Sequence, residues 1–224
     1  MDKRFLTIIG VIIVVFAGIV FYNNHKNNSN SSNDSNLQPT NHVEGDLTSK
    51  VTLVEYGDYE CPVCESYFTT VQQVEEKYNT QIKFQFRNLP LVSIHPNAFA
   101  GARAAEAADL QGKFWQMHDM LYESQDWQDW STSSNPDPYF WSYASELGLN
   151  LAKFKTDFAS TEVNNRIQAD LDAFAKTGEE EATPSFFLNG KYIPNSELVD
   201  SSDTPSITAF SNVINAKLKA TGQN

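Results

Sequence analysis

The sequence predicts an α/β fold in which a sheet is interrupted by a helical insertion, and three observations predict it. A strand-like run, a helix-like segment and a second strand-like run follow one another between residues 51 and 86. From about residue 95 to 177, the chain is alanine-rich or has apolar residues at helical spacing. Strand signals return only at 185–193. Strands that flank a block of helices in this way are expected to form one sheet with helices packed against it.

The N-terminus is predicted to anchor the protein in a membrane. A basic tip at residues 1–4 precedes an apolar run at residues 5–22, which is long enough to span a bilayer. Lys3 and Arg4 predict that the tip is cytoplasmic and that the rest of the chain is exported. A cleaved signal peptide remains the alternative, since Val15–Ala17 could serve as a cleavage site. In either case, we expect the remainder to lie outside the cytoplasm, where disulfides persist.

A linker is expected at residues 23–42, and its Asn- and Ser-rich composition continues to about Lys50. Such a segment has almost nothing apolar to bury and is typical of a flexible tether. One folded domain is expected at residues 43–224, and a monomer is the default. The net charge of −12 argues against nucleic acid as a partner, because nucleic acid requires a basic surface. The charge indicates solubility or an acidic face for a chosen partner.

The first elements of this domain are a strand, a helix and a strand. Residues 51–56 are apolar and β-branched, which predicts a buried strand, and residues 57–60 are expected to turn. Pro62 suits the first turn of the next helix, where its missing N–H costs nothing. Four apolar residues then recur at helical spacing, and alternation at residues 82–86 predicts the second strand. The four core-facing helix residues are Tyr67, Val71, Val74 and Tyr78.

The rest of the domain is mostly helical. We expect helices at 97–110, 113–123, 139–147, 151–158 and 162–176, a loop at 126–138, and a final helix at 205–220. Strands are expected at 185–188 and 191–193, joined by Asn189-Gly190, the preferred type I′ hairpin turn. Five aromatic residues of the insertion are expected to lie mostly in the core, although some could line a peptide-binding groove. They are Phe114, Trp115, Trp127, Trp130 and Trp141.

Cys61 and Cys64 are the only cysteines in the chain. A disulfide that closes so small a loop stabilises a fold by only about 2 kcal/mol in the chain-entropy model, so the pair indicates redox chemistry more than a structural link. Half of a zinc site and an inert disulfide are the alternatives. No second Cys-x-x-Cys is present, and the expected domain contains only His95 and His118. We therefore expect no metal site. The sequence contains no EF-hand loop, so it does not predict a calcium site.

The position of Cys61 at a helix N-terminus predicts that it is the exposed nucleophile, because unpaired backbone N–H groups and the helix dipole favour the thiolate. Cys64, one turn further in, is then the resolving thiol. Glu60 would raise the pKa of Cys61 if it lies close, and Val63 offers the thiolate neither charge nor a hydrogen bond. His95 is expected to be a polar group at a helix N-terminus, and His118 to be packed or on the surface.

These motifs together resemble the DsbA-like thioredoxin-fold family. The resemblance rests on Tyr-Gly-Asp-Tyr-x-Cys-Pro-x-Cys at residues 56–64, on the helical insertion, and on Thr183-Pro184 before the hairpin. It is closest to the membrane-anchored members of that family and covers about residue 51 to the C-terminus. It implies a thioredoxin fold with an inserted helical domain, preceded by one transmembrane helix, and thiol–disulfide oxidoreductase activity.

The resemblance also implies roles for individual residues. Cys61 matches the nucleophile and Cys64 the resolving cysteine, and Pro184 matches a cis-proline that faces the dithiol. The backbone of Thr183 would pair with an extended substrate peptide, and Pro62 and Val63 would also contact substrate. An ordinary trans-proline is the alternative for Pro184.

Glu55 matches a buried acid beneath the resolving thiol. That acid would accept the proton of Cys64, and burial would raise its pKa toward neutrality. A carboxylate that faces solvent from the strand is the alternative for Glu55.

The expected function is therefore donation of the Cys61–Cys64 disulfide to exported, reduced or unfolded proteins, with no other cofactor. A membrane reoxidase of the DsbB or vitamin K epoxide reductase type would restore the bond. A reductase or disulfide isomerase of the same fold is one alternative. A peptide-binding or chaperone-like surface module with an incidental dithiol is the alternative from another class.

Overall fold

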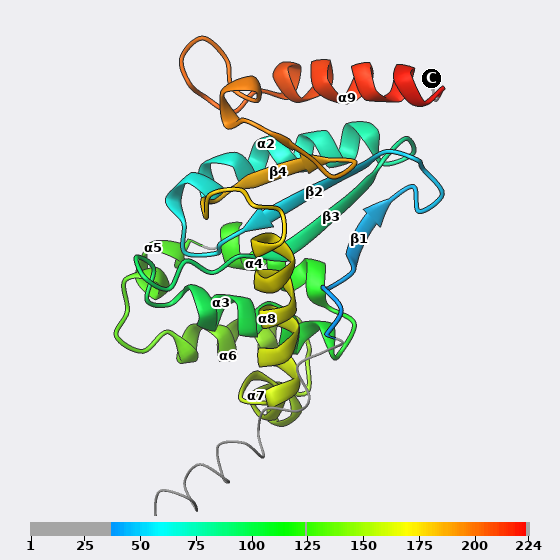
Figure 1. Cartoon of the computed structure of the whole chain (residues 1–224). Coiled ribbons are helices and arrows are strands. Elements are labelled where there is room, and N and C mark those ends of the chain that lie inside the picture. The colour runs from blue at the N-terminus through cyan, green and yellow to red at the C-terminus, as the bar shows by residue number, and fades with distance from the viewer. Residues whose placement is uncertain (1–36, 124, 223–224) are drawn as a thin grey trace, which may run out of the picture. The chain divides into compact units, whose positions relative to one another are not determined.

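The computed structural model describes residues 37–123 and 125–222 of the chain (Figure 1). Within this part of the chain, no helix is long and apolar enough to cross a membrane. The predicted basic tip and anchor at residues 1–22 and residues 23–36 of the predicted linker lie outside the described residues. The described residues from 38 onward form one compact unit, and it contains the dithiol.

The described residues form one five-stranded sheet in the order β1-β3-β2-β4-β5. The central pair, β2 (Thr52–Gly57) and β3 (Lys83–Asn88), is parallel. β1 (His42–Gly45) runs antiparallel to β3, β4 (Ser185–Leu188) antiparallel to β2, and β5 (Lys191–Ile193) antiparallel to β4. A parallel pair requires a crossover, and α2 (Pro62–Tyr78) provides it. The predicted strand–helix–strand start and the terminal hairpin are thus confirmed.

Helices cover both faces of this sheet. On one face α2 lies beside α9 (Ile207–Thr221) (Figure 1). Phe186 of β4 contacts Tyr67 of α2 and Phe210 of α9 there, with ring centroids 5.7 and 5.1 Å apart. On the other face, Phe174 of α8 (Thr161–Ala175) packs against Tyr56 of β2 at 5.1 Å. Leu53 and Tyr56 of β2 belong to different cores, as the alternation of side chains along a strand requires.

The insertion between β3 and β4 is helical, as predicted. It contains α3 (Ala98–Asp109), α4 (Phe114–Glu123), α5 (Trp127–Ser131), α6 (Asp137–Glu146), α7 (Leu151–Phe158) and α8. The loop expected at 126–138 was partly wrong, because α5 forms within it and α6 begins inside its end. α5 is only five residues long, which is too short for helical periodicity to be visible in the sequence. Trp130 is fully buried, as expected of the insertion's aromatic residues.

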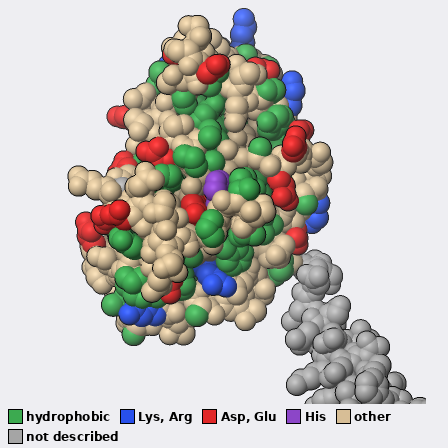
Figure 2. All heavy atoms as spheres, turned by 90° about the vertical axis from the view of Figure 1, so that its left-hand side faces the viewer, with side chains coloured by type: hydrophobic (Ala, Val, Ile, Leu, Met, Phe, Trp, Pro, Cys, Tyr) green, Lys and Arg blue, Asp and Glu red, His purple; other side chains and the backbone are tan. Residues whose placement is uncertain are grey.

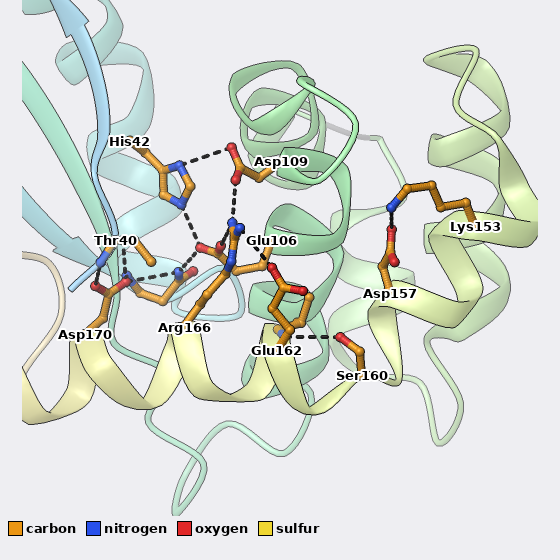
Figure 3. Close-up of polar contacts among 12 residues, drawn as sticks. Thr40, His42, Glu106, Asp109, Lys153, Asp157, Ser160, Glu162, Arg166 and Asp170 are labelled. Atoms are coloured by element: carbon orange, nitrogen blue, oxygen red, sulfur yellow. Dashed lines mark hydrogen bonds and ion pairs between the residues drawn. The ribbon is translucent and has the colours of Figure 1, made fainter. Parts of the chain in front are cut away.

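The tether interpretation was wrong beyond residue 39, because the chain is already folded there. Thr40 and His42 are buried. The backbone N–H and the hydroxyl of Thr40 donate to the two oxygens of Asp170, both at 2.7 Å, and His42 Nε2 lies 2.8 Å from Glu106 Oε1 (Figure 3). These contacts join the first strand to α3 and α8. They involve partners 64 to 130 positions away, which a local reading of composition does not reveal.

The turn between β4 and β5 has the predicted conformation. Asn189 and Gly190 both have positive φ, at 51° and 77°, as a type I′ turn requires. The short hairpin sets the register in which Phe186 and Leu188 face the core beside α2 and α9, and it follows directly on Thr183-Pro184.

Candidate active site around Cys61 and Cys64

The junction between β2 and α2 presents the two cysteines. Cys61 is the N-cap of α2 in an extended conformation, and Pro62 occupies the first turn, as predicted. The backbone N–H of Cys61 donates to the carbonyl of Asp58 at 3.1 Å, and its carbonyl accepts from Glu65 N at 3.1 Å. Cys61 is 5% exposed and Cys64, one turn further in, is 1% exposed. The expectation that Cys61 is exposed was therefore wrong, because its sulfur lies against the backbone of Thr183. Both cysteines are free thiols, so the geometry is that of the reduced dithiol.

The surroundings of Cys61 favour its thiolate and lower its pKa from 9.0 to about 6. The largest cause is a hydrogen bond from the Cys64 side chain. Burial opposes it, and the Thr183 side chain and the backbone N–H groups of Cys64 and Val63 add to the lowering. The N–H groups of the first helical turn thus contribute as expected, but the neighbouring thiol contributes more.

Cys64 and Glu55 are shifted in the opposite direction. Burial raises the pKa of Cys64 well above 9.0, and the charges of Cys61 and Glu55 raise it further. Glu55 is 4% exposed, so the solvent-facing alternative does not hold. Burial, followed by the Cys61 charge, raises the pKa of Glu55 to about 8. A carboxyl group with this pKa can accept and release a proton near neutral pH.

Thr183 and Pro184 face the dithiol from the start of β4. The Thr183–Pro184 peptide bond is cis, as predicted. The Cys61 thiol lies 3.5 Å from the carbonyl oxygen of Thr183, to which it donates. The Thr183 hydroxyl is buried and has no hydrogen-bond partner among the described residues, so it can donate to the thiolate form of Cys61.

The turn before Cys61 is held by side chains that sequence reasoning missed. The buried Asp58 carboxylate accepts from Glu60 N at 2.8 Å, from Leu91 N at 2.9 Å, and pairs with His95 Nδ1 at 2.7 Å. His95 lies just before α3, where its carbonyl accepts from Ala98 N, as expected of a helix N-terminal group, but the pairing of its ring with Asp58 was not predicted. The only available signal was Asp58 itself, a carboxylate within the Tyr-Gly-Asp-Tyr motif.

Two more contacts from the insertion reach the same turn. Glu60 Oε2 accepts from Asn97 N at 2.5 Å, and Trp127 Nε1 donates to the carbonyl of Tyr59 at 2.8 Å. Glu60 was expected to raise the pKa of Cys61 if it lay close, but its charge is not among the main causes that act on Cys61. Its carboxylate serves instead to hold the loop before α3.

Several apolar side chains are exposed at the start of α2 and in the loop before α3. Val63 is 46% exposed, and Val92 and Ile94 are exposed in the loop that carries His95. Figure 2 views the molecule from the side at which α2 begins and shows green apolar patches across the middle of this face. Val63 therefore leaves apolar surface close to Cys61 along the chain.

One cluster in the described residues has the composition of a metal site. Ligand atoms of His42, Glu106 and Asp109 lie within 4.8 Å of one another (Figure 3). His42 was outside the two histidines expected in the domain, because β1 was not predicted. Arg166 already pairs with Asp109 at 2.5 Å and with Glu106 at 3.5 Å, so these carboxylates have a cationic partner. We assign no metal to them.

Known proteins share the sequence pattern and the fold of this chain. A family model described as Thioredoxin matches residues 37–215. A thioredoxin-like oxidoreductase from Silicibacter pomeroyi DSS-3 has a TM-score of 0.64 at 24% identity, over 81% of this chain and 94% of that one. Oxidised BdbD from Bacillus subtilis has a TM-score of 0.64 at 22% identity, over 81% and 96%. The oxidoreductase DsbA from Xylella fastidiosa has a TM-score of 0.58 at 24% identity, over 76% and 89%. These likenesses show the fold.

Curated relatives match over a segment of their length. The Na(+)/H(+) antiporter NhaA 1 of Mycolicibacterium gilvum (strain PYR-GCK) is 37% identical over 152 residues, which are 67% of this chain and 23% of the antiporter. NhaA 3 of Salinispora tropica is 39% identical over 150 residues, 67% of this chain and 22% of that protein. This chain thus spans less than a quarter of these relatives, and the transport in their names concerns those whole proteins.

Proposed function

This chain belongs to the thioredoxin family and has the fold of DsbA-type thiol–disulfide oxidoreductases, and from that premise we propose that it donates the Cys61–Cys64 disulfide to exported proteins. The observation that carries the proposal is the opposite shift of the two thiols. The pKa of Cys61 is lowered to about 6, whereas that of Cys64 is raised well above 9.0. Cys61 is thus suited to act both as nucleophile and as leaving group. Cys64 stays protonated until it attacks the mixed disulfide.

The reaction cycle follows from this asymmetry. A substrate thiolate attacks Cys61 Sγ in the oxidised protein, the Cys61–Cys64 bond breaks, and Cys64 leaves and takes a proton. A second substrate thiolate then attacks the substrate sulfur of the mixed disulfide, and Cys61 leaves as a thiolate. The substrate gains a disulfide, and the protein is left with both cysteines reduced. Glu55, buried near Cys64, supplies the proton in this direction and accepts it when the dithiol is reoxidised.

The direction of electron flow is proposed from the stability of the reduced form. A low pKa for Cys61 stabilises the thiolate of the reduced protein, so the disulfide is the less favoured state and is passed on readily. Val63 gives the thiolate no side-chain hydrogen bond, so oxidation here rests on Cys64, Thr183 and the backbone.

The location and the partners belong to the same proposal. The apolar run at residues 5–22 would hold the protein at the membrane, with the domain on the extracytoplasmic side. Substrates would be reduced or unfolded exported proteins, whose apolar segments suit the exposed side chains around Cys61. A membrane reoxidase of the DsbB or vitamin K epoxide reductase type would regenerate the disulfide.

The test is the reduction potential of the Cys61–Cys64 pair, measured by equilibrating the purified protein against glutathione buffers. A potential of about −120 to −180 mV, the range of strong oxidants and isomerases, is the expected result. A potential of about −270 mV, as in thioredoxin, would reverse the proposed direction and identify a reductase. The Cys61→Ser variant is the control, because it cannot form the pair.

A further inference from the structure

Three buried polar atoms without hydrogen-bond partners converge behind the dithiol. They are Tyr59 Oη, Tyr122 Oη and His118 Nε2, and none has a partner among the described residues. The three rings contact one another, with centroids 5.0 Å apart for Tyr59–Tyr122, 5.6 Å for Tyr59–His118 and 5.3 Å for His118–Tyr122. Buried polar groups are nearly always paired, so three unpaired ones on rings that contact one another call for a functional explanation.

The histidine has one nitrogen on each side of this core. Its Nδ1 lies 3.1 Å from Asp119 Oδ1, and the Asp119 side chain is 46% exposed beside an open surface hollow. An exposed carboxylate at neutral pH accepts hydrogen bonds and cannot donate them, so Nδ1 carries the proton in the neutral ring. The lone pair is then on Nε2, which faces the buried tyrosines. His118 therefore connects the interior with solvent through a single ring.

Glu55 lies on the buried side of these rings. Tyr59 Oη, Tyr122 Oη and His118 Nε2 are not hydrogen-bonded to one another or to Glu55 in the reduced protein, so a tyrosine hydroxyl has to move for each proton transfer. Glu55 lies opposite Phe86 in the β2–β3 ladder, and the Phe86 ring is 4.6 Å from the ring of His118. Gly57, two residues after Glu55 on the same face of β2, leaves room for Tyr122, whose Oη would be 3.1 Å from a Cβ at that position. The charges of Cys64 and Glu55 raise the pKa of Tyr122, and that of Glu55 raises the pKa of Tyr59, so both hydroxyls lie within electrostatic reach of the acid.

We propose that His118, with the hydroxyls of Tyr59 and Tyr122, relays protons between Glu55 and Asp119 during thiol–disulfide exchange. This inference rests on the proposed function, because Glu55 needs to exchange a proton once per redox half-cycle. Cys61, Cys64 and Glu55 are all buried, and a bound substrate would cover the face around Cys61. A proton path that reaches the surface on the α4 side stays accessible to solvent while the substrate is bound as a mixed disulfide.

The proton balance closes over one full cycle. On reoxidation, Cys64 gives its proton to Glu55 as it attacks Cys61 Sγ of the mixed disulfide, and the oxidant's sulfur leaves with the electron pair. The Glu55 proton then passes through a tyrosine hydroxyl to His118 Nε2, and the Nδ1 proton leaves to Asp119. During disulfide donation, His118 Nε2–H passes a proton back through a tyrosine hydroxyl to Glu55, and Nδ1 takes up a proton from solvent by way of Asp119. Glu55 then gives its proton to Cys64 as that sulfur leaves. The two half-cycles use the two tautomers of His118 in turn, so the ring is restored.

The charged groups that face His118 are consistent with a neutral resting ring. Burial lowers its pKa, Asp119 opposes that lowering, and His42 of β1 adds to it. Further titratable groups around this region lie on α4 itself and on the elements packed against it. They are Glu44 on β1, Glu55 on β2, Tyr59 in the active-site turn, Glu75 on α2 and Tyr122 on α4. A ring that is neutral at rest can accept a proton at Nε2, which a relay requires.

The test follows the resolving step in the full-length protein in detergent. The reduced protein is mixed with excess oxidised glutathione, and quenched alkylation follows conversion of the mixed disulfide to the Cys61–Cys64 bond. His118→Gln keeps the volume of the side chain but cannot titrate. It should slow this step about tenfold or more, compared with the roughly 100- to 10,000-fold that general acid–base catalysis typically contributes. The reduction potential should stay that of the unmodified protein, because a relay changes rates and not equilibria. Free imidazole should restore the rate of His118→Ala.

Matched variants separate the relay from a packing role. His42→Gln replaces another buried histidine, stacked on Phe114 at 3.4 Å, and should leave the resolving rate unchanged. The relay is overturned if His118→Gln resolves at the unmodified rate, or if the slow step comes with an altered potential and imidazole does not restore it. Absence of exchange in the unmodified protein would instead overturn the proposed function. The two failures are therefore distinguishable.

Discussion

The sulfur of Cys61 lies 3.5 Å from the carbonyl oxygen of Thr183, although 122 positions separate the two residues. The contact joins the N-terminus of α2 to the segment just before β4. The reactivity of Cys61 is thus set partly by a segment from the far side of the insertion. This relationship makes Thr183 the first position to test.

Thr183→Val should raise the pKa of Cys61 from its value of about 6. Valine keeps the shape of threonine but cannot donate to the thiolate. Loss of a hydrogen bond of about 0.5–1.5 kcal/mol corresponds to a rise of roughly 0.4–1 pH unit. The absorbance of the thiolate at 240 nm, titrated in the reduced protein, measures it. An unchanged titration would show that the Thr183 side chain does not contribute.

Cys64→Ala should accumulate mixed disulfides with substrates, whereas Cys61→Ser should form none. The first variant keeps the activated nucleophile but loses the thiol that resolves it, and the second loses the attacking sulfur. Non-reducing gels of membranes from cells that express each variant provide the measurement. Substrate adducts on Cys61→Ser that equal those on Cys64→Ala would contradict the assigned roles. The double Cys→Ala variant tests whether any cellular effect is independent of the dithiol.

Glu55→Gln should stabilise the reduced protein at alkaline pH but not at acid pH. The folded pKa of Glu55 is raised from 4.5 to about 8, so the native state holds a proton that the unfolded state has lost between these values. Stability from this group is fully present below pH 4.5 and is lost as pH rises through about 8. The gain of the variant should reach roughly 5 kcal/mol above pH 8, at about 1.4 kcal/mol per pH unit.

Urea unfolding of the reduced protein at several pH values measures this gain. The exposed Glu180→Gln is the matched control and should follow the unmodified protein at each pH. A Glu55→Gln advantage that is equal at acid and alkaline pH would indicate a packing effect rather than a buried ionisable group.

Asp58→Ala should destabilise the protein and disturb the active-site turn. It leaves the N–H groups of Glu60 and Leu91 and the ring of His95 without their acceptor, and an unpaired buried donor costs about 1–3 kcal/mol. We expect a loss of about 3 kcal/mol in denaturant unfolding. Asp200→Ala removes a similar turn acceptor from an exposed site and should cost less. Equal losses in the two variants would contradict the anchoring role.

The sequence was sufficient for those elements whose signal is local. The alternation of β3, the helical spacing of α2, the Asn189-Gly190 turn and the two cysteines each act over a few residues, and the structure places them as expected. The boundaries of α7, β4 and β5 were predicted without error. Glu55 and Thr183-Pro184 could be located only through the resemblance, because nothing local indicates that a strand carboxylate or a proline will face a thiol.

What could not be predicted depends on contacts between distant segments. β1 carries polar residues in a polar stretch, and it is fixed by Asp170 and Glu106, neither of which is its neighbour in sequence. Asp58 and His95 lie 37 positions apart and have no shared periodicity. The inward-facing nitrogen of His118 depends on how α4 packs against β3, which composition does not specify. Such pairings require the folded chain.

The anchors of the active-site turn bear on how this protein could be re-engineered. Asn97 and Trp127, which lie in the insertion, and His95 and Leu91, in the loop leading to it, all bind residues 58–60. A shortened protein made of the strands, α2 and α9 would keep the Cys-Pro-Val-Cys sequence but lose most of these fixed points. The Cys-Pro-Val-Cys sequence alone is therefore not expected to keep its reactivity when it is grafted onto another protein. The helices that hold residues 58–60 would have to be transferred with it.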